Sequence, residues 1–106
     1  MGFMAKKNGY ADYVCEHPET KVQWHIEAKG VTQAIGLDFR TGLGQLIKGM
    51  SNETTNYALA FPDTPAFHSQ ARGIASWVRK NFNIYWLIVK LDGSVDVVAP
   101  EESLLP

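Results

Sequence analysis

The sequence contains little cysteine and no excess of charge of either sign. Its single cysteine, Cys15, excludes an internal disulfide and suits a reducing compartment. Ten basic and eleven acidic residues give a formal net charge of -1 at pH 7. No global field therefore attracts nucleic acid, and any contact with phosphate groups must come from a local patch.

Long apolar runs, internal repeats and low-complexity segments are also missing. The longest apolar run, Ile84–Val89, is far shorter than the roughly 20 residues needed to cross a bilayer. No apolar stretch follows Lys6 and Lys7, so we expect no signal peptide. We therefore expect a cytoplasmic protein without membrane contact, and a single domain over residues 1–106.

Segments with the period of strands alternate with segments with the period of helices. Strands are predicted over residues 9–15, 22–29, 56–61, 84–91 and 95–99, and helices over residues 38–50 and 64–81. Asp38 is the expected N-cap of the first helix, and Asp92-Gly93 predicts a hairpin with a two-residue turn. This pattern is typical of an α/β domain, with a mixed central sheet, helices on its faces and the order β-β-α-β-α-β-β.

The strand over residues 22–29 has one apolar and one polar face. The apolar face holds Val22, Trp24, Ile26 and Ala28, and the polar face holds Gln23, His25, Glu27 and Lys29. Glu27 and Lys29 therefore emerge about 6–7 Å apart on one face. An acidic strand residue can bind a hard divalent cation, and a lysine beside it can position or deprotonate a water.

A second carboxylate belongs to the preceding predicted strand. An antiparallel hairpin through residues 16–21 can bring Asp12 beside Glu27. With the Ala28 carbonyl, the two carboxylates would make an oxygen-ligand site for Mg²⁺, for which Mn²⁺ can substitute. Such a metal stabilises charge on a scissile phosphate and generates the attacking hydroxide.

Two segments resemble the PD-(D/E)XK nuclease superfamily, which includes restriction endonucleases and the nuclease domains of type I restriction subunits. They are Gly9-Tyr10-Ala11-Asp12-Tyr13-Val14 and Trp24-His25-Ile26-Glu27-Ala28-Lys29-Gly30. Gly44-Gln45-Leu46 is similar to the glutamine segment that recurs on the following helix of many members. The resemblance implies a restriction-endonuclease-like core and Mg²⁺-dependent hydrolysis of nucleic acid, with DNA favoured. It also implies that Asp12 and Glu27 are metal ligands, Lys29 is the catalytic lysine and Gln45 aids positioning.

The sequence departs from the superfamily pattern before the aspartate strand. Residue 11 is alanine rather than proline, which the superfamily tolerates. A helix usually precedes the aspartate strand, whereas only eight residues precede Gly9. We therefore expect this first helix to be short or missing, so that the chain is a fragment, a minimal member or one completed by a partner chain.

Four basic residues are candidates for contact with a nucleic-acid backbone, and a solvated helix face is the alternative for each. Arg40 and Lys48 flank the proposed site, and Arg72 and Arg79 share one face of the second predicted helix. Within the first helix, Gly42 and Gly44 suggest that neighbouring backbone or a ligand approaches its surface closely.

Two further functions stay open beside the nuclease. The domain could be a catalytically inactive relative that binds nucleic acid or serves as an assembly module, or a structural α/β protein in which the motif is accidental. For a nuclease, a homodimer or a partner chain would supply specificity. His25 could contact a phosphate or the metal surroundings, or be a structural histidine, while Cys15 is expected to be a buried or idle thiol.

Overall fold

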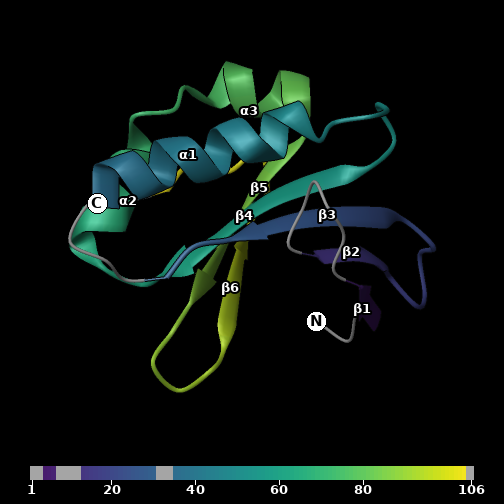
Figure 1. Cartoon of the computed structure of the whole chain (residues 1–106), viewed down its shortest axis with the longest axis horizontal. Coiled ribbons are helices and arrows are strands. Elements are labelled where there is room, and N and C mark those ends of the chain that lie inside the picture. Colours follow the sequence, from purple (N-terminus) through teal and green to yellow (C-terminus); the bar gives the residue numbers. More distant parts are fainter. Residues whose placement is uncertain (1–3, 7–12, 31–34, 105–106) are drawn as a thin grey trace.

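The strands lie across a mixed sheet in the order of the sequence (Figure 1). The computed structural model describes residues 4–6, 13–30 and 35–104. Its strands are β1 (Met4–Lys6), β2 (Tyr13–Glu16), β3 (Gln23–Ala28), β4 (Asn56–Pro62), β5 (Ile84–Val89) and β6 (Val95–Val98). Strands β3, β4 and β5 are parallel, while β1, β2 and β3 pair antiparallel and β6 pairs antiparallel with β5. The expected α/β class and mixed sheet are confirmed.

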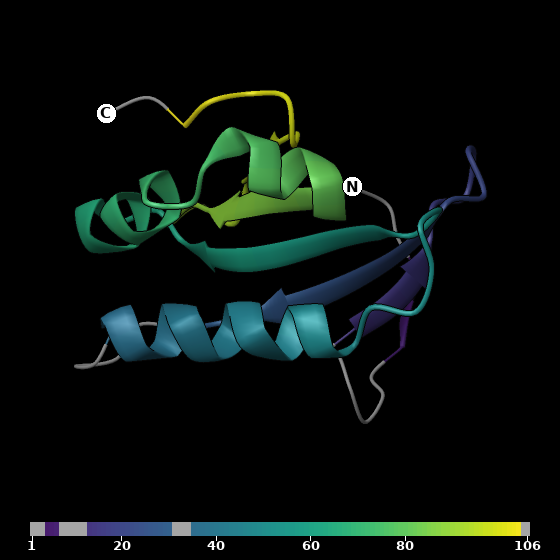
Figure 2. The same cartoon turned by 90° about the horizontal axis from the view of Figure 1, so that it is seen from above.

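Three helices, α1 (Ile35–Lys48), α2 (Pro65–Arg72) and α3 (Ser76–Phe82), lie on the same face of the sheet, which is the upper side in Figure 1; seen from above in Figure 2, β4 runs between α1 and the other two. Phe39 of α1 and Arg79 of α3 both pack on Trp86, at 5.6 Å between ring centroids and 4.9 Å from guanidinium to ring centroid. Helices and strands share one buried core: Phe39, Leu46, Tyr57, Leu59, Phe61, Phe67, Ala71, Ile84, Trp86 and Ile88. Within the described residues, helices therefore cover one face of the sheet, not both as the sequence suggested.

The other face of the sheet carries a smaller core that is built from strand residues. Cys15, Trp24, Ala58, Ala60 and Leu87 are buried there. The rings of Trp24 and Tyr85 approach to 4.6 Å between centroids from the strands on either side of β4. Tyr85 pairs with Ala58 of β4, whose small side chain leaves room for the two rings to meet. We call this side of the sheet the helix-free face.

The observed elements differ from the predicted ones mainly at their ends. Strand β1 was not expected, and the first predicted strand is observed as β2, with residues 9–12 outside the described ranges. Helix α1 begins at Ile35, so Asp38 lies in its first turn rather than at its N-cap, where its charge still favours the helix dipole. Among the apolar residues spaced three and four apart along this helix, Phe39 and Leu46 are buried, whereas Ile47 is exposed.

The predicted helix over residues 64–81 is divided into α2 and α3 at Gly73. Of the two residues that the sequence offers for opening this helix, Asp63 and Thr64, it is Thr64 that caps α2, since its side chain accepts a hydrogen bond from the Phe67 N–H. Gly73 is the C-cap residue at which α2 ends. Helix α3 begins after Ala75, and its faces do not continue those of α2. Arg79 is therefore buried, whereas Phe82 is exposed. The prediction that Arg79 shares an accessible helix face with Arg72 is therefore wrong.

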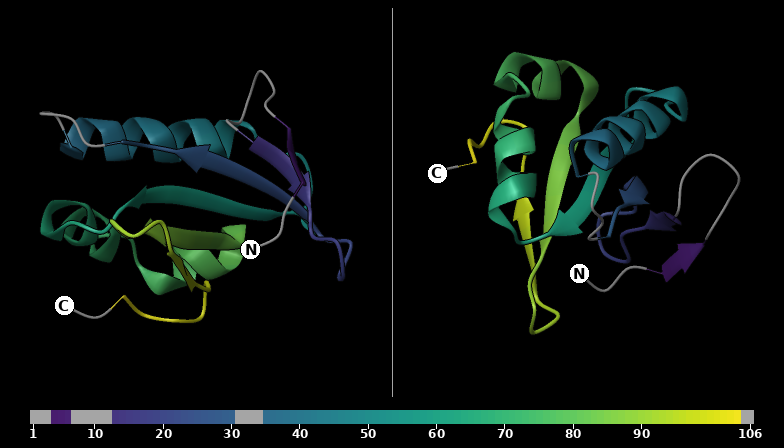
Figure 3. Two further views of the ribbon diagram at one scale, coloured as in Figure 1. Left: turned by 90° about the horizontal axis from the view of Figure 1, so that it is seen from below. Right: turned by 60° about the vertical axis from the view of Figure 1, so that its left-hand side comes forward.

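The hairpin between β5 and β6 extends away from the helices (Figure 3). The Lys90 N–H donates to the Ser94 carbonyl at 2.9 Å, which leaves Leu91, Asp92 and Gly93 as a three-residue turn. Gly93 adopts φ +87°, a conformation that other residues rarely reach. The turn is thus one residue longer than predicted. No helix in the described part of the chain is long and apolar enough to span a membrane.

Arg79 fastens the segment that follows β6. Its guanidinium donates to the carbonyls of Glu102 at 2.7 Å, Ala99 at 2.8 Å and Val98 at 3.1 Å, and only 2% of Arg79 is exposed. Because its guanidinium is buried and hydrogen-bonded to backbone carbonyls, Arg79 is unavailable to a nucleic-acid backbone. This corrects its selection from the sequence as a candidate for nucleic-acid contact.

We expect Arg79→Met to lower the free energy of unfolding by about 2–3 kcal/mol, because charged hydrogen bonds to three carbonyls are lost. Urea denaturation followed by circular dichroism measures the change. Arg72→Met is the matched control, since Arg72 is exposed at the end of α2, and it should change stability by less than about 0.5 kcal/mol. Equal losses in the two variants would contradict the anchoring role of Arg79.

Cys15 is 3% exposed on the helix-free face, and burial raises the pKa of its thiol. We expect Ellman's reagent to modify the native protein slowly, since the thiolate is the reactive form, and the urea-unfolded protein at once. Absorbance of the released thiolate gives both rates. Similar rates in the two states would show that the thiol is accessible.

Candidate functional site

The polar face of β3 is directed toward the helices. In the parallel ladder, His25 pairs with Tyr57 and Glu27 pairs with Leu59. Tyr57 and Leu59 belong to the core beneath the helices, and paired residues project from the same side of a sheet. Glu27 is consequently 5% exposed. Because burying a carboxylate has a high free-energy cost, this position is a candidate functional site.

Lys29 extends the same face just beyond β3. Its backbone N–H donates to the Ala60 carbonyl at 2.9 Å, so the chain still follows β4 at this point. Its aliphatic stem lies against Gly42 of α1: a Cβ atom at Gly42 would be 2.9 Å from Lys29 Cγ and 3.0 Å from Lys29 Cε. The close approach expected at the glycines is therefore found at Gly42, and the group that approaches is the lysine stem.

Gln45 lies on α1 between two points where the helix meets β3. Gly42 faces Lys29 near the end of the strand, and the Gly49 carbonyl faces His25 four residues earlier in the strand. Helix α1 thus runs opposite to β3, and Gln45 is at the level of Glu27. Its side chain is exposed, whereas the neighbouring Leu46 is buried. The helix therefore places Gln45 at the margin of the candidate site.

His25 packs as part of the fold. Its ring meets Tyr57 edge-on, with 5.4 Å between centroids, and burial lowers its pKa although the Gly49 carbonyl opposes this shift. Its Nδ1 atom is buried and has no hydrogen-bond partner among the described residues. This environment favours the structural interpretation of His25.

The predicted metal ligands are placed only in part. Asp12 lies outside the described residues, but the next residue, Tyr13, pairs with Ile26 in the antiparallel hairpin of β2 and β3. Glu27 and the carbonyl of Ala28 are hard oxygen donors of the kind that Mg²⁺ prefers. In the described ranges, no three His, Cys, Asp or Glu side chains gather into a metal-binding group. The described donors fit the ion but do not complete its ligand set.

Three of the four candidate basic residues are on the surface. Arg40 and Lys48 are exposed on α1, and Arg72 is exposed at the end of α2. These positions leave their charges accessible to a phosphate backbone, in contrast to Arg79.

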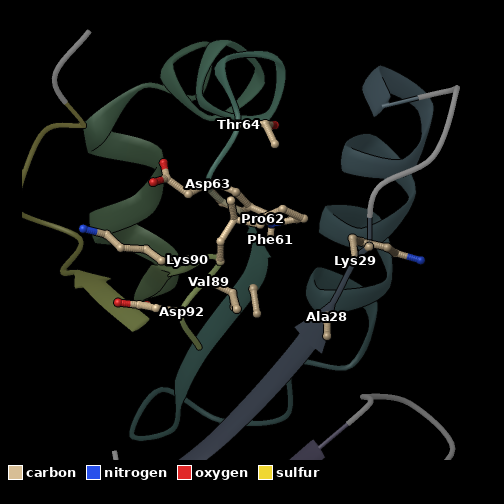
Figure 4. Close-up of a pocket in the computed structure, with 12 residues that line it drawn as sticks. Ala28, Lys29, Phe61, Pro62, Asp63, Thr64, Val89, Lys90 and Asp92 are labelled. Atoms are coloured by element: carbon tan, nitrogen blue, oxygen red, sulfur yellow. The ribbon is translucent and has the colours of Figure 1, made fainter. Parts of the chain in front are cut away.

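A cavity of about 850 Å³ lies at the carboxyl ends of β3, β4 and β5 (Figure 4). Its lining includes Lys29 and three residues not selected from the sequence: Asp63, Lys90 and Asp92. The sequence could have indicated these three residues by their position directly after two parallel strands, because α/β proteins commonly bind ligands there.

The chain matches no family model, no curated protein and no solved structure. The resemblance to the nuclease superfamily therefore depends on the motif residues themselves.

We expect Gly44→Ala and Gly42→Ala to have different effects on stability. Alanine favours the helix by about 1 kcal/mol at either position. At Gly44 a Cβ atom meets nothing within 4 Å, whereas at Gly42 it would also lie 3.0 Å from Leu59 Cδ1. Overpacking costs about 1–3 kcal/mol, so Gly44→Ala should stabilise the protein and Gly42→Ala should not. Urea denaturation tests this, and equal stabilisation would show that the lysine stem and Leu59 adjust freely.

Proposed function

We propose that the protein is a divalent-metal-dependent nuclease that hydrolyses phosphodiester bonds, with DNA as its favoured substrate, on a restriction-endonuclease-like form of its α/β fold. The observation that carries this proposal is the placement of Glu27 and Lys29 on the helix side of β3, with Glu27 5% exposed. Hydrophobic burial favours an apolar strand face toward the core, whereas β3 directs its polar face there. Such conflicts concentrate at functional sites.

Asp12, Glu27 and the Ala28 carbonyl would hold the metal. The pairing of Tyr13 with Ile26 supports this set, because one further pair in the same register would join residues 12 and 27. When bound, Mg²⁺ or Mn²⁺ supplies charge stabilisation for the phosphate and a more acidic water.

Lys29 and Gln45 would position the reacting groups. The stem of Lys29 is confined by α1 at Gly42, so its ammonium group has fewer conformations to lose on binding a phosphate or orienting a water. Gln45, at the level of Glu27, would offer its amide to the same water or phosphate. Arg40, Lys48 and Arg72 would contact the backbone of the nucleic acid.

We expect Lys29→Ala to lower Mg²⁺-dependent cleavage of a mixed DNA substrate by at least about 100-fold, since it removes the group that positions or deprotonates the water. Gel electrophoresis of end-labelled DNA measures the rate. Lys80→Ala, an exposed lysine at the end of α3, is the control and should retain activity. Circular dichroism verifies that both variants are folded.

Titration calorimetry with Mn²⁺ provides a readout independent of cleavage. Wild-type protein should bind the ion, and Glu27→Gln, which keeps the shape of the side chain but removes its charge, should lose the binding heat. Equal cleavage by wild type and Lys29→Ala would reject the role of Lys29. Absence of both cleavage and ion binding in wild type would instead favour the inactive domain that binds nucleic acid or serves in assembly.

A further inference from the structure

The cavity at the carboxyl ends of β3, β4 and β5 is lined from both faces of the sheet, since Phe61 of the helix-side core and Thr64 at the N-cap of α2 border it. Other walls belong to the helix-free face. Ala28 pairs with Ala60, and Pro62 pairs with Val89. All four line the cavity and share the face of the core that contains Ala60. Leu91, which is fully exposed in the β5–β6 turn, adds a further apolar wall. The cavity is therefore suited to an apolar or flat group.

Three of the four charged side chains that line the cavity are already engaged. Asp63 lies 2.7 Å from His68 Nε2, Lys90 lies 3.0 Å from Asp96, and Asp92 accepts hydrogen bonds from the N–H and hydroxyl of Ser94. Lys29 has no ion pair or side-chain hydrogen bond among the described residues. Figure 4 shows its ammonium directed away from the middle of the cavity, at the margin. Lys29 is thus the one charged side chain of the described lining without such a partner, beside two exposed carboxylates and the exposed Lys90.

A ligand that matches the apolar walls and Lys29 has a flat, weakly polar body and one anionic group. Ala28 faces the cavity and Lys29, the next residue, faces α1, so the two environments are about 3.3 Å apart along the chain. A phosphate at Lys29 and a base in the cavity can therefore belong to one nucleotide.

We propose that the cavity binds an unpaired nucleobase of the strand whose phosphate lies at Lys29. This inference rests on the proposed nuclease function and specifies its substrate class. A base cannot occupy the cavity and remain stacked and paired in a duplex, so the preferred substrate is single-stranded nucleic acid or an unpaired end.

Binding to DNA in EDTA tests the proposal without cleavage. The probe is a 20-nucleotide single-stranded DNA that carries fluorescein at one end and 2-aminopurine in its middle, compared with the same strand in a duplex. Anisotropy should give at least about tenfold tighter binding to the single strand. The intensity of 2-aminopurine should change on binding, because the base leaves its neighbours.

Val89→Asp and Val97→Asp form a matched pair of variants. The two valines are 39% and 43% exposed on the same sheet face, but only Val89 lines the cavity. Both variants add the same charge to the same sheet face, so Val97→Asp controls for the effect of an added negative charge on this face. Val89→Asp should remove the single-strand preference and the 2-aminopurine change, and Val97→Asp should retain both. Leu91→Asp, in the exposed turn, should act like Val89→Asp and guards against a folding defect at Val89.

The outcomes separate this inference from the nuclease proposal. Equal binding of single strand and duplex by wild type, or equal effects of Val89→Asp and Val97→Asp, overturns the cavity assignment. If Mg²⁺-dependent cleavage that requires Lys29 is then still observed, the nuclease proposal stands alone. A single-strand preference that depends on Val89 supports the cavity, even where wild type fails to cleave DNA and the nuclease proposal is rejected.

Discussion

The pairing register between β3 and β4 is the constraint on which the rest of the site depends. Because Glu27 is opposite Leu59, the carboxylate projects under α1, and Trp24 and Ile26 project to the helix-free face. A slip of one residue would exchange the two faces and bury the apolar set beneath the helices. Burial alone would favour that exchange. The observed register is held on the other edge as well, where Cys15 pairs with Trp24 in the second core.

Small residues allow the sheet to pack although the polar face of β3 is directed toward the helices. On the helix side, Gly42 lets α1 approach the stem of Lys29 and the side chain of Leu59. On the helix-free side, Ala58 lets the rings of Trp24 and Tyr85 meet across β4 and shield the strand from water. The sheet is therefore closed on one side by helices and on the other by aromatic rings of its own strands.

Local periodicity predicted the α/β class, the positions of most strands and the two faces of β3. It could not predict which face meets the helices, because alternation defines two faces but not their surroundings. Arg79 was misplaced because one helical phase was continued through Gly73, where α2 ends and after which α3 begins as a separate helix. The cavity was missed since its lining comes from three strand ends that are distant in the sequence. Whether Asp12 joins Glu27 stays a prediction.

The end of β3 is where the two faces of the sheet become accessible from one place. Within a strand, consecutive side chains are separated by the sheet itself, so a ligand on one face cannot reach the other. At the last paired residues this barrier ends, so Ala28 and Lys29 can contact two parts of one molecule. A chain-like ligand with alternating charged and flat groups matches this geometry better than a compact ion or an apolar molecule. The same edge would thus provide both the chemistry on the helix side and the selection on the helix-free side.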